Sequence, residues 1–243
     1  MKYLLFLLFI PSISFGSIIA GSSYNGIAND SQVLMLAHCE GNDDGQVFID
    51  TSGRHTLAAV NHSSTTIDQV KFGLTSCYVD GADWVTIADN LTDLVMANSF
   101  TIEGWTYITT QGDGKGWMST DLGASNIGWA LGASNDTSKH YSCWDNAAWQ
   151  NSSTDITLNA WVHWAFVRNT EASSKCDLYV NGVSVKSFIK TGNIGCSNAG
   201  ASFGGVWTND YAAAYAIAGY IDEIRISKVA RWTHNFTVPN RAY

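Results

Sequence analysis

The sequence predicts an all-β protein, a two-sheet antiparallel β-sandwich of the jelly-roll type. Short apolar or alternating segments follow one another at close intervals, as the strands of a sandwich do. No stretch has a convincing amphipathic helix period, apart from a turn or two around residues 91–96. The composition agrees, because 46% hydrophobic residues with only 14% charged residues favour a packed globule over disorder.

The expected strands are separated by turns rich in Gly, Asn and Asp, residues that suit turn conformations. The clearest hairpin joins residues 177–180 to 183–187, since Asn181-Gly182 suits the positive φ angles of a type I′ turn. Trp105, Trp161 and Trp164 lie within expected strands, so we assign all three to the core. In chain order the expected strands are 33–39, 74–79, 84–87, 100–108, 161–168, 177–180, 183–187, 203–206 and a closing strand within 219–232.

The closing strand carries a carboxylate among apolar side chains. A repeat of two residues would point Tyr220, Asp222, Ile224 and Ile226 one way, and Ile221, Glu223, Arg225 and Ser227 the other. An unpaired carboxylate is costly to bury. We therefore expect Asp222 to meet a cation, a cluster of donors or a metal.

Residues 1–16 have the features of a secretory signal peptide. Lys2 gives a positive start, residues 3–10 are apolar, and residues 14–16 (SFG) form a small-x-small cleavage site. The alternative is an uncleaved anchor, but the apolar run is interrupted at Pro11 and is shorter than the roughly 20 residues of a spanning helix. We expect export, a leader or linker at residues 17–32, one domain at 33–243, and no membrane insertion after signal removal.

The net charge excludes one class of partner. A formal charge of −8 makes binding to nucleic acid or to an anionic membrane surface by charge unfavourable.

Seven segments, in this order, carry a family resemblance. The chain resembles the laminin-G-like jellyroll domains of the concanavalin A-like lectin/glucanase superfamily over roughly residues 33–238. This resemblance implies the same two-sheet sandwich. The segments are LMLAHCEG (34–41), DTSG (50–53), KFGLTSCYVDG (71–81), FTIEGW (100–105), WVHWAFVR (161–168), LYVNG (178–182) and IDEIRIS (221–227).

The resemblance also implies a structural calcium ion. Its ligands would be Glu40, where the family often has Asp, together with Asp80, Gly81 and Asp222. Hard oxygen ligands from strand ends are of the kind that Ca²⁺ prefers. The alternative is that Asp222 caps a turn or pairs with a nearby amide or Arg.

Five cysteines are consistent with export and with two disulfides plus one remaining thiol. Several could equally be small buried apolar residues. Cys39 and Cys77 stand where the resembled family usually has large apolar residues, which makes a bridge between them conceivable.

The chain does not carry the residues of a glycoside hydrolase. Laminarinase-type relatives place their carboxylates as Glu-x-Asp-x-Glu on one strand, whereas none of Glu40, Glu103, Glu171 or Glu223 begins a Glu-x-Asp. His163 has no nucleophile motif beside it. We therefore expect no catalytic activity.

Two segments between expected strands combine aromatic rings with polar groups, as carbohydrate sites do. The alternative is that these aromatics plug the ends of the sandwich. The candidates are Trp144, Asp145 and Trp149 in the first segment, and Trp207, Asn209, Asp210 and Tyr211 in the second.

Together these features predict a secreted or surface-displayed recognition module that binds a glycan or cell-surface polysaccharide and holds a structural calcium. Inference from fold to ligand is analogy. The alternatives are a structural protein of a cell surface, virion or appendage, assembled as a homo-oligomer, and an atypical hydrolase.

Overall fold

The structure is a computed structural model that describes residues 30–88, 92–110, 115–121, 127–134, 139–195, 200–205 and 216–243. Within these residues the elements are strands and one 3₁₀ turn, η1 (Thr92–Val95). The strands are β1 (Val33–Ala37), β2 (Leu57–Val60), β3 (Ser64–Thr66), β4 (Ser76–Asp80), β5 (Trp84–Ile87), β6 (Phe100–Thr110), β7 (Gly116–Asp121), β8 (Ile127–Ala133), β9 (His140–Trp144), β10 (Trp149–Asp155), β11 (Trp161–Asn169), β12 (Lys175–Val180), β13 (Val183–Ile189), β14 (Gly200–Phe203) and β15 (Ala218–Ser227).

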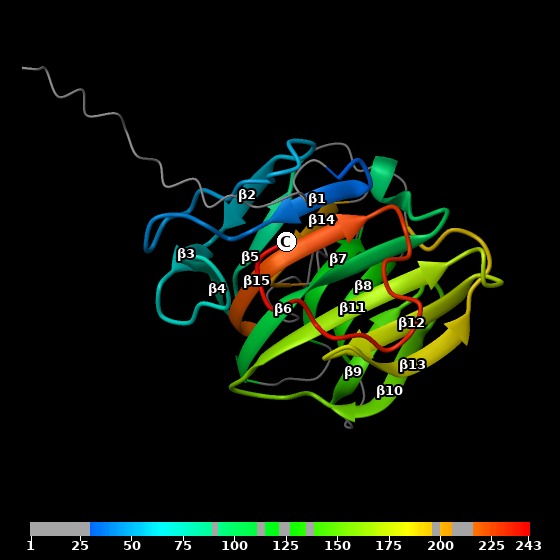
Figure 1. The fold of residues 1–243 in the computed structure, drawn as a ribbon. Coiled ribbons are helices and arrows are strands. Elements are labelled where there is room, and N and C mark those ends of the chain that lie inside the picture. The colour runs from blue at the N-terminus through cyan, green and yellow to red at the C-terminus, as the bar shows by residue number, and fades with distance from the viewer. Residues whose placement is uncertain are drawn as a thin grey trace, which may run out of the picture.

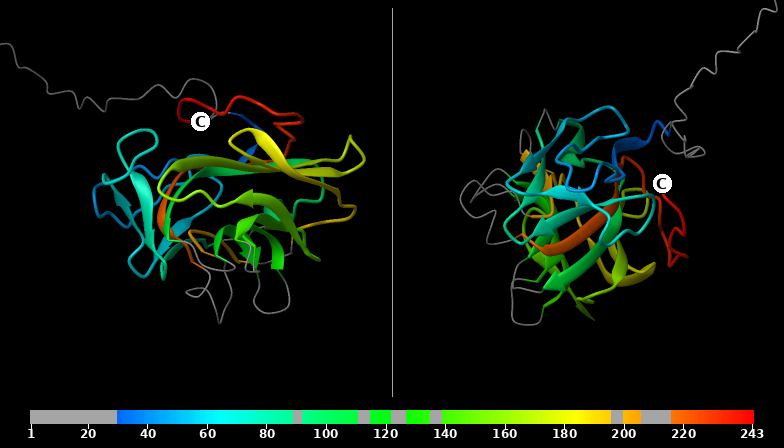
Figure 2. Two further views of the ribbon diagram at one scale, coloured as in Figure 1. Left: turned by 90° about the horizontal axis from the view of Figure 1, so that it is seen from below. Right: turned by 90° about the vertical axis from the view of Figure 1, so that its left-hand side faces the viewer.

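The strands form two antiparallel sheets that pack face to face (Figure 1, Figure 2). Among the described residues, sheet A has eight strands in the order β13-β12-β11-β6-β15-β4-β3, with β1 also paired to β15. Sheet B has seven described strands in the order β10-β9-β8-β7-β14-β5-β2. The predicted β-sandwich is therefore confirmed.

Four strands of sheet B, β7 to β10, lie in a region where no strand is predicted from the sequence. Their inward positions carry large rings such as Trp117, Trp129 and Tyr141, which belong to the core. In β8 and β9 the intervening positions carry small or polar residues such as Ala130 and Ser142. The alternation is thus present, but Gly, Ser and Asn lower the strand propensity of these segments.

The core between the sheets is rich in aromatic rings. Trp117 of sheet B packs on Trp164 of sheet A, with ring centroids 6.2 Å apart. Trp117, Trp129, Trp164 and Phe166 are each 0% exposed. Burying an apolar side chain of this size stabilises the fold by roughly 1.5–3 kcal/mol, so these rings hold the two sheets together.

The predicted hairpin at Asn181-Gly182 is confirmed. It joins β12 to β13, and both turn residues have positive φ angles, 48° and 78°. Asn and Gly tolerate these angles best, which explains why the turn could be recognised in the sequence.

The alternation predicted for the closing strand is wrong beyond Asp222. Ile221, Ile224 and Ile226 all belong to the core, so a residue has been added between them. The pairing of β15 with β6 shifts between Asp222 and Arg225, and Glu223 has a φ of 52°. This β-bulge leaves Asp222 outside the apolar face to which the simple repeat assigned it.

One edge of β15 is shared by two strands placed end to end. β4 pairs with residues 218–221, and β1 pairs with residues 224–227. A disulfide joins Cys39, just after β1, to Cys77 of β4. The bridge that the resemblance made conceivable is therefore present, and it ties the two strands on either side of the bulge.

The remaining described cysteines form no disulfide. Cys143 and Cys176 are buried free thiols, while Cys196 lies outside the described residues. Burial raises the pKa of Cys176 to about 12, so this thiol stays protonated at neutral pH.

The C-terminal segment, residues 228–243, lies across the outer face of sheet A (Figure 1). Its Trp232 and Phe236 stack with ring centroids 3.9 Å apart. They pack against a small apolar cluster of the sheet that includes Ala165, Val167 and Tyr179. Part of sheet A is therefore covered on both sides.

The predicted signal, residues 1–16, and residues 17–29 of the predicted leader lie outside the described residues. A helix long and apolar enough to cross a membrane is not found in the described part of the chain.

Replacing both disulfide cysteines by Ser should lower the free energy of unfolding by about 2–4 kcal/mol, because the bond spans 38 residues of sequence. Urea unfolding of the wild type and of Cys39→Ser/Cys77→Ser measures this. Dithiothreitol should lower the wild type to the level of the double variant and leave the variant unchanged. Equal stabilities of the two oxidised proteins would contradict the expectation.

Candidate functional site

Two predicted glycan-contact residues, Trp144 and Trp149, lie side by side at the edge of sheet B. They are direct partners in the β9–β10 hairpin, with ring centroids 5.7 Å apart and planes 62° apart. Tyr141 and Cys143 of β9 belong to the core, so Trp144 points to the outer face. Both tryptophans are partly exposed. The pair therefore offers aromatic surface to solvent.

Asp145 has a different role from the predicted one. It is 4% exposed, and its carboxylate accepts hydrogen bonds from the backbone N–H groups of Ala147 and Ala148 at 3.0 and 2.9 Å. The amide of Gln150 donates to it at 3.0 Å, and Lys190 Nζ lies 3.4 Å away. Asp145 therefore organises the turn that places the two tryptophans beside each other, and its oxygens are already engaged.

The positions of the second group of predicted glycan-contact residues are not described. Trp207, Asn209, Asp210 and Tyr211 lie outside the described residues.

A row of four aromatic side chains that was not predicted from the sequence crosses the outer face of sheet A. In space the order is Tyr78, Tyr220, Tyr107 and Trp161, each the cross-strand partner of the next. Successive ring centroids lie 5.4, 5.8 and 5.8 Å apart. All four are partly exposed. We call these four residues the aromatic row.

The strand positions of these rings could be read from the sequence, but their pairing could not. Each alternates with a core residue: Val79, Ile221, Ile108 and Val162. The assignment of Trp161 to the core is therefore wrong, since it lies on the opposite face of β11 from Trp164. Trp105 is buried, but also on the outer face, between Phe72 and His163 with centroids 5.7 and 5.1 Å away.

The four residues predicted to bind calcium do not all come together. Asp80 pairs with Ala218, four residues before Asp222 on β15, which places the two backbone positions about 13 Å apart along the strand. Asp80 instead accepts the N–H of Ala82 at 2.8 Å, and Gly81 is part of the same turn, with a φ of 100°. Asp80 and Gly81 therefore do not fit a site built on Asp222.

Glu40 and Asp222 both hold the loop between β3 and β4. Asp222 Oδ2 accepts the N–H groups of Lys71 and Phe72 at 3.0 and 3.1 Å, and Glu40 accepts that of Leu74 at 3.0 Å. The alternative expectation, that Asp222 pairs with nearby amides, is therefore correct for Oδ2.

The second oxygen of Asp222, Oδ1, is buried and has no hydrogen-bond partner among the described residues. Burial, helped by the nearby carboxylates of Glu223 and Glu40, outweighs the two backbone hydrogen bonds and raises the pKa of Asp222 to about 8. A proton or a cation would satisfy this oxygen. Within the described residues, no three His, Cys, Asp or Glu side chains gather closely enough to hold a metal ion. The calcium ion stays a prediction, and Asp222 is the residue on which it depends.

Glu103 forms a buried network under the C-terminal segment. Arg225 donates to it through Nε and Nη2 at 3.0 and 2.6 Å, and the Trp232 indole donates at 2.7 Å. Burial alone would raise the pKa of Glu103, but the charge of Arg225 and the hydrogen bond with His163 outweigh it. The pKa falls from 4.5 to about 2. This carboxylate is fully engaged and 0% exposed.

Glu223 is the second buried carboxylate on this face. His38 Nδ1 lies 2.8 Å from one of its oxygens, and the backbone N–H of Tyr243 donates to the other at 2.7 Å. Both glutamates therefore hold the C-terminal segment in place, and neither is accessible to a substrate.

Comparisons with known proteins agree with this architecture. A family model described as concanavalin A-like lectin/glucanases superfamily matches residues 79–234. The comparison with curated proteins gives no match.

Solved structures of an arabinanase domain and of toxin binding domains share the fold. Domain 4 of AbnA, a GH43 extracellular arabinanase from Geobacillus stearothermophilus in complex with arabinotriose, has a TM-score of 0.56 and 18% identity. The alignment covers 82% of this chain and 93% of that domain. The binding domain of Paraclostridial Mosquitocidal Protein 1 has a TM-score of 0.60 and 15% identity, with coverage of 82% and 49%. That of Botulinum Neurotoxin DC in complex with SialylT has a TM-score of 0.55 and 16% identity, with coverage of 84% and 49%. The chain thus spans about half the length of the two toxin domains.

The stability of the protein should fall as the pH drops from about 4.5 to about 2. Glu103 has a lowered pKa in the folded state, so its stabilising contribution is complete above the unfolded value of 4.5 and is lost as the pH approaches 2. Urea unfolding at several pH values in this range measures the slope. Glu103→Gln should flatten it, whereas Asp44→Asn, at an exposed carboxylate, should not. An unchanged slope in Glu103→Gln would refute the role of this residue.

If calcium binds at Asp222, it should raise the melting temperature of the wild type relative to the protein in EDTA. A ligand at one hundred times its Kd adds about 2.7 kcal/mol to the free energy of unfolding. Asp222→Asn keeps the shape of the side chain but removes the charge, and should abolish the increase. Asp80→Asn is the matched control and should keep it. No change of the wild type with calcium would rule out the ion.

Proposed function

Because the chain belongs to the concanavalin A-like lectin/glucanases superfamily, we propose that it is a non-catalytic carbohydrate-binding module that acts outside the cell. Two proteins of the same fold support the choice of ligand, since their structures contain arabinotriose and SialylT. The Cys39–Cys77 disulfide supports an oxidising compartment such as the cell exterior.

The observation that carries the proposal is the Trp144–Trp149 pair. Sugar rings present C–H faces that stack on aromatic side chains, and two adjacent indoles at a sheet edge provide such a surface. Polar side chains continue the same strands: His140 of β9 lies 3.1 Å from Asp155 of β10. The hairpin thus combines apolar rings with groups able to bond hydroxyls.

The buried carboxylates support a binding role over catalysis. A glycosidase needs two carboxyl groups that reach the scissile bond from opposite sides. Glu103 and Glu223 are 0% and 1% exposed, and both are bonded to other side chains or to the C-terminal segment. Glu40 binds the backbone of Leu74. These groups are therefore engaged in stabilising the fold.

Trp149→Ala should weaken glycan binding at least about tenfold, which corresponds to about 1.4 kcal/mol, because hot-spot aromatics contribute this much or more. A glycan array, with and without EDTA, identifies a ligand, and calorimetry with that glycan or with arabinotriose measures the change. Trp161→Ala is the matched control, since it removes a partly exposed tryptophan of the aromatic row on the other sheet.

The pair of variants separates the two surfaces. Loss of binding in Trp161→Ala with full binding in Trp149→Ala would move the site to the aromatic row. Absence of binding to any glycan, with or without calcium, would refute the proposed function.

A further inference from the structure

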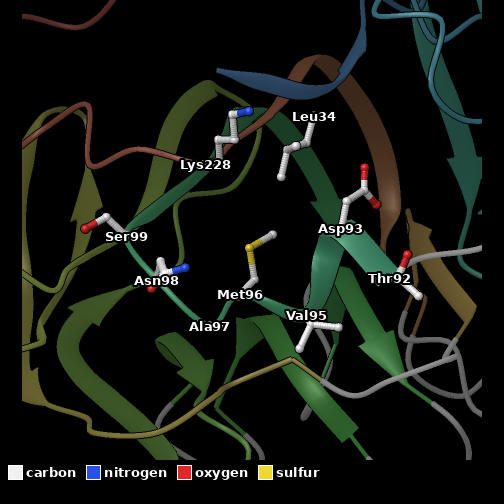
Figure 3. Close-up of a pocket in the computed structure, with 9 residues that line it drawn as sticks. All are labelled: Leu34, Thr92, Asp93, Val95, Met96, Ala97, Asn98, Ser99 and Lys228. Carbon is white, nitrogen blue, oxygen red and sulfur yellow. The ribbon is translucent and has the colours of Figure 1, made fainter. Parts of the chain in front are cut away.

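A pocket of about 230 Å³ lies outside the surfaces described above, between β1, η1 and the loop that precedes β6 (Figure 3). Leu34 and Met96 contribute apolar surface, and each is 5% exposed. In Figure 3, Lys228 and Ser99 lie on one side of the pocket and Asp93 and Thr92 on the other, with Met96 between them. The lining therefore combines an apolar centre with polar groups of opposite charge on two sides.

The wall of the pocket is held from behind by buried contacts. Nη1 of Arg168, a residue that is 2% exposed, donates to the carbonyl oxygens of Met96 and Ala97 at 3.2 and 3.5 Å. The N–H of Gly195 donates to the carbonyl of Val95 at 2.8 Å. Met96 is held at a φ of 53°, a left-handed backbone conformation that is unfavourable for a non-glycine residue. The surrounding contacts offset this cost, so the pocket is formed before any ligand arrives.

The polar groups of the lining are also positioned. His55 Nε2 lies 3.4 Å from the Asp93 carboxylate, whose side chain is 32% exposed. Ser99 Oγ is 2.9 Å from the hydroxyl of Thr170. It also accepts a hydrogen bond from the backbone N–H of Thr170 at 3.0 Å. Within the described residues Lys228 forms no ion pair, and its side chain is exposed. Lys228 thus provides a cation that is free to meet an anion at the pocket.

We propose that this pocket binds a single sugar-acid residue, such as a hexuronate. The carboxylate would pair with Lys228, hydroxyl groups would donate to Asp93, and the C–H face of the ring would pack on Leu34 and Met96. The volume is that of about eight water molecules, which suits one sugar ring.

The choice of an acidic sugar follows from the charges. The protein carries a formal charge of −8, so an anion is attracted only where an unpaired cation is at hand. Asp93 accepts hydrogen bonds and has no proton to donate when ionised, so it selects for hydroxyl donors. This inference rests on the proposed function, because the ligand is again a sugar. The pocket is a separate site from the Trp144–Trp149 pair.

Calorimetric or NMR titration with D-glucuronate tests the proposal. Two comparison probes are D-glucose, which lacks the carboxylate, and hexanoate, which lacks the hydroxyl groups. Glucuronate should bind more tightly than either. Lys228→Met should weaken glucuronate at least about tenfold. Lys186→Met changes the net charge equally, on β13, and should leave the affinity unchanged. Asp93→Asn should weaken glucuronate and glucose alike.

Further outcomes keep this inference apart from the proposed function. Trp149→Ala should leave glucuronate binding intact while it weakens the neutral oligosaccharide. Three results would each overturn the proposed binding of a sugar acid. They are wild-type affinity of Lys228→Met for glucuronate, no binding of glucuronate to the wild type, and loss of glucuronate binding in Trp149→Ala. Unchanged melting temperatures of the variants confirm that they are folded.

Discussion

A buried ion pair, Glu103 of β6 with Arg225 of β15, determines how sheet A is closed on its outer side. Two charges inside a protein are costly unless each is fully bonded. Here the Trp232 indole completes the bonding of Glu103, and the guanidinium lies 3.7 Å from the ring centroid of Tyr243. The pair therefore requires the C-terminal segment to lie where it does. Among the described residues, this segment leaves open the edge of sheet B, the aromatic row and the pocket beside η1.

The bulge in β15 explains why carboxylates gather at one place. β4 and β1 share one edge of β15, and the junction between them leaves Asp222 and Glu223 without a regular ladder. Glu223 turns to His38 and Tyr243, whereas Asp222 turns to the loop before β4. The bulge thus buries two neighbouring carboxylates, of which Glu223 holds the C-terminal segment and Asp222 holds the loop before β4.

The sandwich, the Asn181-Gly182 hairpin and the Cys39–Cys77 partnership could be anticipated, because each depends on local residue chemistry or on the order of recognisable segments. The sequence predicted that Trp144 and Trp149 could contact a glycan, but not that they lie beside each other. That geometry depends on the register of β9 and β10. The bulge at Glu223 could not be read, since a bulge is set by what both neighbouring strands require. The same limit hid the aromatic row, whose four rings come from four strands far apart in sequence.

The shared edge of β15 also determines how the domain responds to mechanical force. β1 and β15 are antiparallel, with Val33 opposite Ser227. Tension that separates these two positions peels the strands apart one hydrogen-bonded pair at a time, the direction in which a sheet resists least. The peeling stops at Cys39, where the disulfide transfers the load to β4, which is held between β15 and β3. Tension between these two positions would therefore extend the chain by only a few residues before the disulfide bears the strain.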